Sequence, residues 1–205
     1  MTAMDAEIKK GRKFDQVLDG AREIFMRDGF EGASVDDIAR AAGVSKATLY
    51  SYFPDKRLLF SEVARIECNR QAEDALQVVS ASESIEQVLH EAASRAVRFF
   101  LSDFGQQVFR ICVAESYRFP ELGQRFYNSG PALFCERMGS VLTPFVEKGV
   151  LKIDDMELAT KQFGELCKTD LFMRCLCGVE CDRSDPSIDR IITGAVDTFL
   201  ARYRA

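Results

Sequence analysis

The chain of 205 residues has no tryptophan, one histidine and only five prolines. No apolar run approaches the ~20 residues that a helical membrane span requires, and the N-terminal MTAMDAEIKKGRKF lacks the apolar core of a signal peptide. There is no HExxH, no GxSxG and no glycine-rich phosphate loop, so the common catalytic motifs are absent from the sequence. We therefore expect a cytoplasmic protein that is not an enzyme, with no catalytic residues, no cofactor, no metal site and no membrane partner.

The most informative segment is 34–60, SVDDIARAAGVSKATLYSYFPDKRLLF. Ser34 followed by Asp37 is typical of a capping box, so a helix is predicted to begin there, and its apolar residues repeat at helical spacing. Gly43 provides the backbone freedom that ends this helix, and a second helix is predicted over 45–52. Two short helices joined by a glycine turn are the layout of a helix-turn-helix, whose second helix enters the major groove of DNA.

The predicted second helix has an outer face suited to DNA. At roughly 100° per residue, Leu49 and Phe53 point inward, whereas small and hydroxylated side chains point outward. Such side chains can meet thymine methyls, base edges and phosphates, while Lys46 suits guanine and the helix start at Lys56 suits phosphate. The predicted contacts are Lys46, Ala47, Thr48, Tyr50, Ser51, Tyr52 and Lys56. An aromatic core segment is the alternative interpretation of LYSYF.

Residues 14–60 resemble the DNA-binding domain of the TetR family of transcriptional regulators, through IFMRDGFEGAS and the nearly continuous GVSKATLYSYFPDKRLL. The resemblance implies an all-α protein with a three-helix helix-turn-helix domain over 1–55. It implies a larger helical domain over 56–205 for ligand binding and dimerisation. It also implies that Ser34 contacts phosphate, and that the protein is a homodimeric repressor on a palindromic double-stranded operator. AESYRFPELGQRFYNSGPALF is similar to the AefR-like branch.

Net charge does not favour DNA binding. Residues 1–60 carry ten basic and ten acidic side chains, and the rest of the chain accounts for the net charge of −5. A DNA-binding segment usually has a basic excess, so attraction has to come from local clusters. These clusters are the N-terminal arm, which is either a phosphate contact or a solvated leader, and the basic residues around the predicted second helix. Their members are Lys9, Lys10, Arg12 and Lys13 in the arm, then Lys46, Lys56 and Arg57.

Beyond residue 60 the pattern predicts helices throughout. A turn is expected at Ser102–Gly105 and a break at Asn128–Pro131, while Asp185 before a proline is typical of a helix N-cap. The predicted helices are 56–79, 85–100, 106–117, 155–177 and 186–203.

The last predicted helix has an apolar stripe too wide for a helix lying on the surface of a small domain. Either the helix is central to the core or its outer edge packs on another chain. The TetR resemblance implies a homodimer through the last two helices, which would place two recognition helices about 34 Å apart. A monomer with a C-terminal core helix is the alternative.

The middle of the chain is rich in phenylalanine, with eight of the sixteen between residues 99 and 145. The family resemblance places a ligand cavity there, and polar groups among the rings could orient a ligand. We predict a hydrophobic or aromatic small-molecule inducer, with plain aromatic core as the alternative. The predicted ligand-binding residues are Phe100, Phe104, Arg110, Glu115, Tyr117, Phe126 and Phe134.

Seven cysteines are present, and a cytosolic chain should keep them reduced. Cys175, Cys177 and Cys181 lie close together, so they could bind a soft metal or form a redox switch. Zinc sites usually show paired C-x2–4-C ligands, and cysteine is also an ordinary small core residue. A thiol- or metal-responsive DNA-binding regulator is therefore the alternative function.

Overall fold

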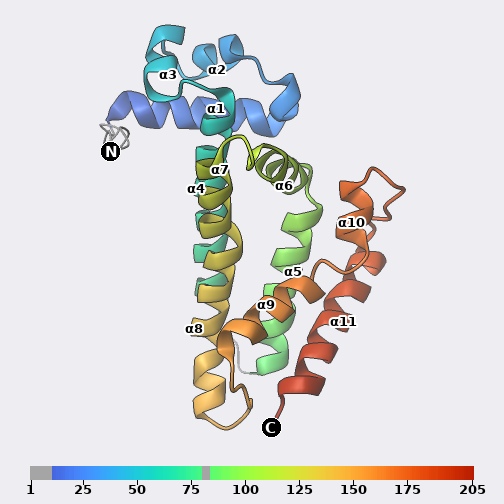
Figure 1. Cartoon of the computed structure of the whole chain (residues 1–205). Helices are drawn as coiled ribbons and strands as arrows, with labels where there is room; N and C mark the ends of the chain where they lie inside the picture. The colour runs from blue at the N-terminus through green and yellow to red at the C-terminus, as the bar shows by residue number, and fades with distance from the viewer. Residues whose placement is uncertain (1–10, 80–83) are drawn as a thin grey trace. The chain divides into compact units, whose positions relative to one another are not determined.

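The computed structural model describes residues 11–79 and 84–205, which form helices connected by short turns (Figure 1). Within these ranges the one β-type contact is an isolated antiparallel bridge between Leu151 and Arg204. The all-α prediction is thus confirmed. None of the helices in the described ranges is long and apolar enough to cross a membrane.

The chain divides into two compact units, the first ending at Ala64 and the second beginning at Arg65. This division falls inside α4 (Lys56–Val79), whereas the domain boundary predicted from sequence is residue 55. Each unit is described by itself below.

The first unit contains three helices and the start of a fourth: α1 (Arg12–Gly32), α2 (Val35–Ala41), α3 (Lys46–Tyr52) and the first turns of α4. Both short helices begin at serine N-caps. Ser34 Oγ accepts the backbone N–H of Asp37 at 3.0 Å, and Ser45 Oγ accepts that of Thr48 at 3.1 Å. Each cap satisfies a donor that a helix start leaves unpaired. Gly43 follows α2 with φ 62°, a left-handed conformation that costs glycine nothing.

The core of the first unit forms where one face of α1 packs on α2, and the two backbones meet closely at Gly20. A Cβ on Gly20 would lie 2.5 Å from the backbone nitrogen of Ala42. Phe25 and Phe60 meet edge to face with ring centroids 5.0 Å apart. The buried apolar residues of this unit include Phe14, Val17, Leu18, Ala21, Ile24, Phe25, Ile38, Ala39, Leu49, Phe53, Leu59 and Phe60.

The second unit is larger and consists of the rest of α4 and the helices that follow it. In order they are α5 (Ile85–Leu101), α6 (Asp103–Glu115), α7 (Pro120–Tyr127), η1 (Asn128–Ala132), α8 (Leu133–Glu147), α9 (Met156–Leu166), α10 (Leu171–Leu176) and α11 (Asp185–Tyr203).

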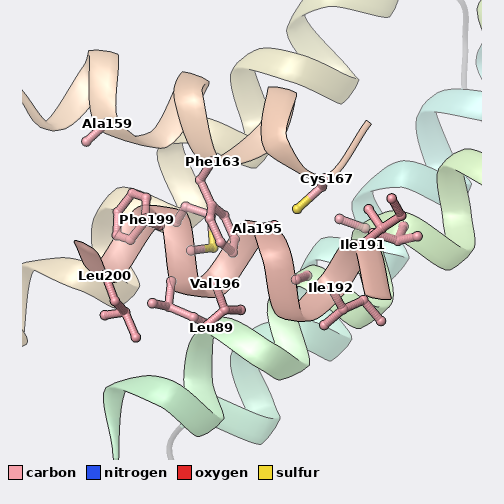
Figure 2. Close-up of a cluster of buried hydrophobic side chains, with 14 of the residues drawn as sticks. Leu89, Ala159, Phe163, Cys167, Ile191, Ile192, Ala195, Val196, Phe199 and Leu200 are labelled. Atoms are coloured by element: carbon pink, nitrogen blue, oxygen red, sulfur yellow. The ribbon is translucent and has the colours of Figure 1, made fainter. Parts of the chain in front are cut away.

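Helix α11 packs on α5 and α9 with one face, and its opposite face is exposed (Figure 2). Phe163 of α9 and Phe199 of α11 meet edge to face at 5.2 Å between ring centroids. Every residue of the predicted apolar stripe is buried within one chain: Ile188, Ile191, Ile192, Ala195, Val196, Phe199 and Tyr203. The width of the stripe therefore reflects packing inside the protomer, and it does not by itself indicate a partner chain.

The predicted break at Asn128–Pro131 was wrong. The segment is the π-helical stretch η1, and α7, η1 and α8 follow one another as a single long rod (Figure 1). In a regular α-helix the ring of Pro131 would clash with the carbonyl four residues earlier, and the residue donates no backbone hydrogen bond. A π turn shifts the hydrogen-bond pattern by one residue and accommodates the ring.

The helix predicted over 155–177 was also wrong, since the structure has two helices there. The chain leaves helical geometry at Asp170, whose φ is +58°, between α9 and α10. No glycine or proline marks this position, so the sequence pattern had no signal for it. Two other helices begin slightly earlier than predicted. Helix α6 begins at Asp103, after the N-cap Ser102, and α11 begins at Asp185, after Ser184.

Candidate nucleic-acid interface and ligand cavity

The outer surface of α3 carries most of the predicted DNA contacts. Lys46, Ala47, Tyr50 and Ser51 are exposed, and their spacing of one and four residues places them on one face of the helix. Leu49 lies inward and is 1% exposed, as predicted. The aromatic residues of LYSYF therefore divide between core and surface, with Tyr50 47% exposed.

Two further residues of α3 are partly engaged within the protein. The hydroxyl groups of Thr48 and Ser45 lie 2.9 Å apart, and Thr48 is half-buried. The ring of Tyr52 meets Phe14 edge to face with centroids 5.6 Å apart. The first contact reinforces the start of α3, and the second holds α3 against α1, so both residues help to orient the exposed face as well as bordering it.

Lys46 forms an ion pair with Asp36 of α2, with 2.6 Å between Nζ and Oδ1. A hydrogen bond to Asp36 is the main cause that raises the pKa of Lys46 above its usual value. Both side chains are more than half exposed, at 53% and 60%. Because exposed ion pairs contribute little free energy, a phosphate or a guanine could replace Asp36 at small cost.

Ser34 lies at the start of α2, where its hydroxyl donates to Asp37 Oδ2 at 2.5 Å. This hydrogen bond is the main cause that lowers the pKa of Asp37, with Arg40 a further contributor through Nη1 at 2.7 Å. Ser34 is exposed, but its hydroxyl already serves the cap. To bind a phosphate, the Ser34 hydroxyl would have to donate its hydrogen to the phosphate instead of the Asp37 carboxylate, and it could keep accepting the backbone N–H of Asp37.

Lys56, which the sequence predicts to contact phosphate, has hydrogen-bond partners inside the first unit. Its ammonium donates to the backbone oxygens of Phe30 at 2.8 Å and Ala33 at 3.0 Å, and it lies 4.3 Å from the ring centroid of Phe30. Lys56 thus joins the start of α4 to the C-terminal end of α1. The arm residues Lys9 and Lys10 lie outside the described residues, and Arg12 and Lys13 begin α1 as exposed residues.

The second unit contains a partly open cavity of about 380 Å³ bordered by α5, α6, α7, η1, α8, α9 and α10. Six phenylalanines line it: Phe99, Phe100, Phe109, Phe126, Phe134 and Phe172. Several pack edge to face, with Phe109 5.0 Å from Phe172 and 6.0 Å from Phe126 between centroids. The volume falls in the range of sites for small organic molecules.

The predicted ligand residues divide into two groups. Phe100, Phe126 and Phe134 border the cavity, whereas Phe104, Arg110, Glu115 and Tyr117 are not among its lining residues. Arg110 instead donates to the backbone oxygen of Cys175 at 2.8 Å, and Tyr117 is 99% exposed at the end of α6. The part of α6 that borders the cavity is the stripe Gly105, Val108 and Phe109.

Sequence reasoning missed all of the charged side chains that line the cavity, which come from α5, α8, α9 and the turn after α9. Three of the lining cations have ion-pair partners: Arg95 bonds Glu91 at 2.6 Å, Lys168 bonds Glu165 at 2.6 Å, and Lys161 bonds Glu157. Lys168 also lies 5.6 Å from the ring centroid of Phe100. The signal available in the sequence was their helical spacing, as at Glu91 and Arg95, but that spacing also fits an ordinary surface pair.

The cysteine cluster differs from the expectation that all thiols stay reduced. Cys175 and Cys181 form a disulfide, and Arg183 Nε lies 3.4 Å from Cys175 Sγ. Cys177 is exposed, with its sulfur 3.8 Å from Met173 Sδ. Burial raises the pKa of the Cys167 thiol to about 12, so the group stays protonated and has little of the reactive thiolate form. In the part of the chain that the structure describes, no three potential ligands cluster as a metal site would require.

Two protein families match the chain, one in each unit, and together the matches span most of its length. Residues 17–63 match the family described as bacterial regulatory proteins, tetR family. Residues 87–205, more than half of the chain, match the AefR-like transcriptional repressor, C-terminal domain.

Individual proteins are similar as well. The HTH-type transcriptional repressor AcnR of Corynebacterium efficiens is 40% identical over 58 residues, which are 28% of this chain and 31% of AcnR. The chain thus matches about a third of that relative's length. The structure of the flavonoid-responsive regulator FrrA covers 95% of this chain and 98% of its own, with 34% identity and a TM-score of 0.67. A TetR-family regulator from Mesorhizobium loti covers the same shares, with 26% identity and a TM-score of 0.80.

Proposed function

Because the chain belongs to the TetR family of bacterial regulatory proteins, we propose that it is a dimeric transcriptional repressor. It binds a palindromic operator and leaves it when a hydrophobic or aromatic small molecule enters the cavity. The observation that carries this proposal is the exposed face of α3, held rigidly by two serine caps and a glycine turn. Repression by AcnR, which the chain matches at 40% identity over 58 residues, supports the direction of regulation.

In the proposed complex α3 lies in the major groove. Ala47 and the Thr48 methyl meet thymine methyls, Lys46 exchanges Asp36 for a guanine or a phosphate, and Tyr50 and Ser51 donate to base edges or phosphates. Ser34, Tyr52 and the backbone N–H groups at the helix starts contact the phosphates beside the groove. In the DNA-free protein, the ion pair with Asp36 holds the Lys46 side chain in an extended conformation.

The proposed dimer forms through the last helices, α9 and α11. Leu158 on α9 is 49% exposed, and a Cβ on Gly194 of α11 would meet no atom within 4 Å. An exposed apolar side chain and a small residue with open space beside it suit close packing of helices from two protomers. Two-fold symmetry then sets the half-sites about one helical turn apart.

The cavity supports an aromatic inducer. Its wall is largely phenylalanine, and FrrA, which is 34% identical over nearly its whole length, is described as flavonoid-responsive. Release requires only a difference in ligand affinity between two conformations. The ligand has to bind the conformation that cannot bind DNA more tightly than it binds the conformation that can. Coupling of about 1–3 kcal/mol gives a 5- to 150-fold change in operator affinity.

Selection from a randomised duplex pool tests this function. We expect an inverted repeat whose half-site centres are about 10 base pairs apart, selected by protein that sediments as a dimer. Lys46→Gln should change the preferred base at one position of each half-site, at a cost of about 1–3 kcal/mol for the original base. Lys152→Gln, the same change of charge in the second unit, should select the unchanged repeat. Absence of any enriched sequence at low salt would contradict DNA reading.

The Cys175–Cys181 disulfide favours a second candidate, a thiol-responsive repressor. Two thiols and one hydrogen peroxide would give the disulfide and two waters, and the bond would tie α10 to the segment before α11. The same selected duplex separates the two candidates. If dithiothreitol and peroxide change operator affinity in opposite directions and aromatic compounds leave it unchanged, the thiol pair is the sensor.

A further inference from the structure

Arg137 of α8 lines the cavity and differs from the other charged side chains there. Its Nε is buried and has no hydrogen-bond partner. No ion pair joins its guanidinium to any side chain that the structure describes, which leaves out 1–10, 68 and 71–83. A buried donor without a partner carries a desolvation cost, which is larger when the group is charged.

The charges around the cavity leave one cation without a counter-charge among the described residues. Arg95 is paired with Glu91, and Lys168 with Glu165. Lys161 is paired with a glutamate one turn earlier on its own helix, and this contact raises its pKa. Arg137 is the remaining lining cation, so the wall has one positive charge in excess at its position.

Arg137 lies in the part of the cavity where α8 faces α9, and Thr160 lines the same part. A Cβ on Gly164 of α9 would lie 3.2 Å from the ring of Phe134 in α8, and one on Gly139 would lie 3.5 Å from the first residue of α9. These two approaches show that α8 and α9 run antiparallel. Arg137, one turn after Phe134, therefore lies across from Thr160, one turn before Gly164.

The aromatic part lies toward α6 and α10. There Phe100 and Phe172 are 5.9 Å apart, and Phe109 packs edge to face on Phe172. Rings in this arrangement accept an apolar or aromatic body by offset or edge contacts. A ligand that fills both parts is apolar at one end and anionic at the other.

We propose that the inducer is an aromatic or aliphatic carboxylic acid whose carboxylate binds Arg137. A carboxylate accepts two parallel hydrogen bonds from a guanidinium, the geometry that arginine favours. It would satisfy the orphan donor and the excess charge together, which a neutral ligand could do only in part. The volume of about 380 Å³ suits one or two fused rings or a medium acyl chain. The inference rests on the proposed function insofar as the cavity must bind a ligand.

Calorimetric titration of the full-length protein with matched pairs tests the proposal. The probes are 2-naphthoate, 4-phenylbutyrate and decanoate, each beside its primary amide, which keeps the shape and removes the charge. At least one acid should bind about tenfold or more tightly than its amide, the factor expected when a charge-assisted hydrogen bond replaces a neutral one. Amides that equal or exceed all three acids, or no binding by any of the six compounds, would overturn it.

Variants locate the effect. Arg137→Gln should reduce the acid preference to below about threefold and leave the amide affinity nearly unchanged, while Arg137→Lys should keep part of the preference. Arg98→Gln is the matched control, because it is the same substitution at an arginine that pairs with Asp185 and does not line the cavity. An acid preference that survives in Arg137→Gln, with Arg98→Gln unchanged, would exclude Arg137 as the carboxylate site. The comparison of acids with amides uses the unmodified chain, so it does not depend on whether the variants fold.

Failure of this inference and failure of the proposed function give different results. If the neutral amides bind and release operator DNA, ligand-released repression stands and the carboxylate preference is wrong. If acids bind through Arg137 without changing operator affinity, the carboxylate site stands and induction through this cavity is wrong.

Discussion

The two units of this protein build their functional surfaces in opposite ways. In the first unit the proposed DNA-reading residues lie within one helix of seven residues, α3, and local caps hold that helix. In the second unit the cavity wall comes from helices spread between Glu91 and Phe172. The first surface therefore depends on neighbours along the chain, whereas the second depends on how distant helices meet.

The two sites also differ in how the chain packs around them. At Gly20 of α1 a Cβ would lie 2.5 Å from the backbone nitrogen of Ala42, just after α2. The second unit also has close approaches, as at Gly164 beside Phe134, but around Phe100 and Phe172 it leaves about 380 Å³ unfilled. Close packing suits a rigid surface for DNA, and the unfilled volume suits binding of a small molecule.

The largest effect should come from Gly20→Val. The branched side chain would force α1 and α2 apart, at a cost of about 3 kcal/mol, the upper end of typical overpacking penalties. Operator binding should be lost while acid binding in the second unit persists, as measured by denaturant unfolding and calorimetry. Gly11→Ala is the control, because a Cβ there meets nothing within 4 Å. Equal unfolding curves for Gly20→Val and the unmodified chain would contradict the close approach.

A smaller effect is expected for Lys56→Met, which removes two hydrogen bonds to the carbonyls of Phe30 and Ala33. Loss of a charged donor should lower the free energy of unfolding by about 1–2 kcal/mol. The salt dependence of operator binding distinguishes this role from the phosphate contact predicted from sequence. A phosphate contact would lower the slope of log K against log salt by about one. An unchanged unfolding free energy with a lower slope would restore the original prediction.

The smallest effect concerns the cap of α2 at acid pH. The Ser34 hydroxyl bond is the main cause that lowers the pKa of Asp37, so the folded protein favours the carboxylate. Its stabilising contribution is present above the ordinary aspartate pKa of about 3.9 and is lost as pH falls through the lower folded value. The thermal midpoint of the unmodified chain should fall toward that of Asp37→Asn as the pH is lowered below about 4. Asp36→Asn, which removes the neighbouring charge without touching Ser34, should keep the pH-dependent fall.

Much of the first unit could be predicted from the sequence. Ser34 and Ser45 begin helices, Gly43 ends one, and Leu49 and Phe53 are buried, all as the pattern indicates. The limit was Lys56, because its partners Phe30 and Ala33 lie more than twenty residues earlier. Nothing in the local pattern shows where a long flexible side chain finds its acceptors.

The second unit was harder to predict for the same reason. Helical periodicity located α5 and α11 and their buried stripes, but it could not show which phenylalanines border empty space. Phe100 and Phe104 are equally apolar, yet of these two only Phe100 lines the cavity. The break at Asp170 and the continuous helix through Pro131 also depend on packing, since each goes against the usual preference of its residue.

The sequence by itself determined the all-helical fold, the helix-turn-helix and the family, because caps, glycine turns and helical periodicity act between neighbours a few residues apart. Only the tertiary structure decided that Lys56 joins α1 to α4, that Cys175 pairs with Cys181, and that Arg137 lines the cavity with no counter-charge among the side chains that the structure describes. Those outcomes depend on distances between residues far apart in the chain. They arise from side-chain packing and desolvation, which a one-dimensional pattern does not contain.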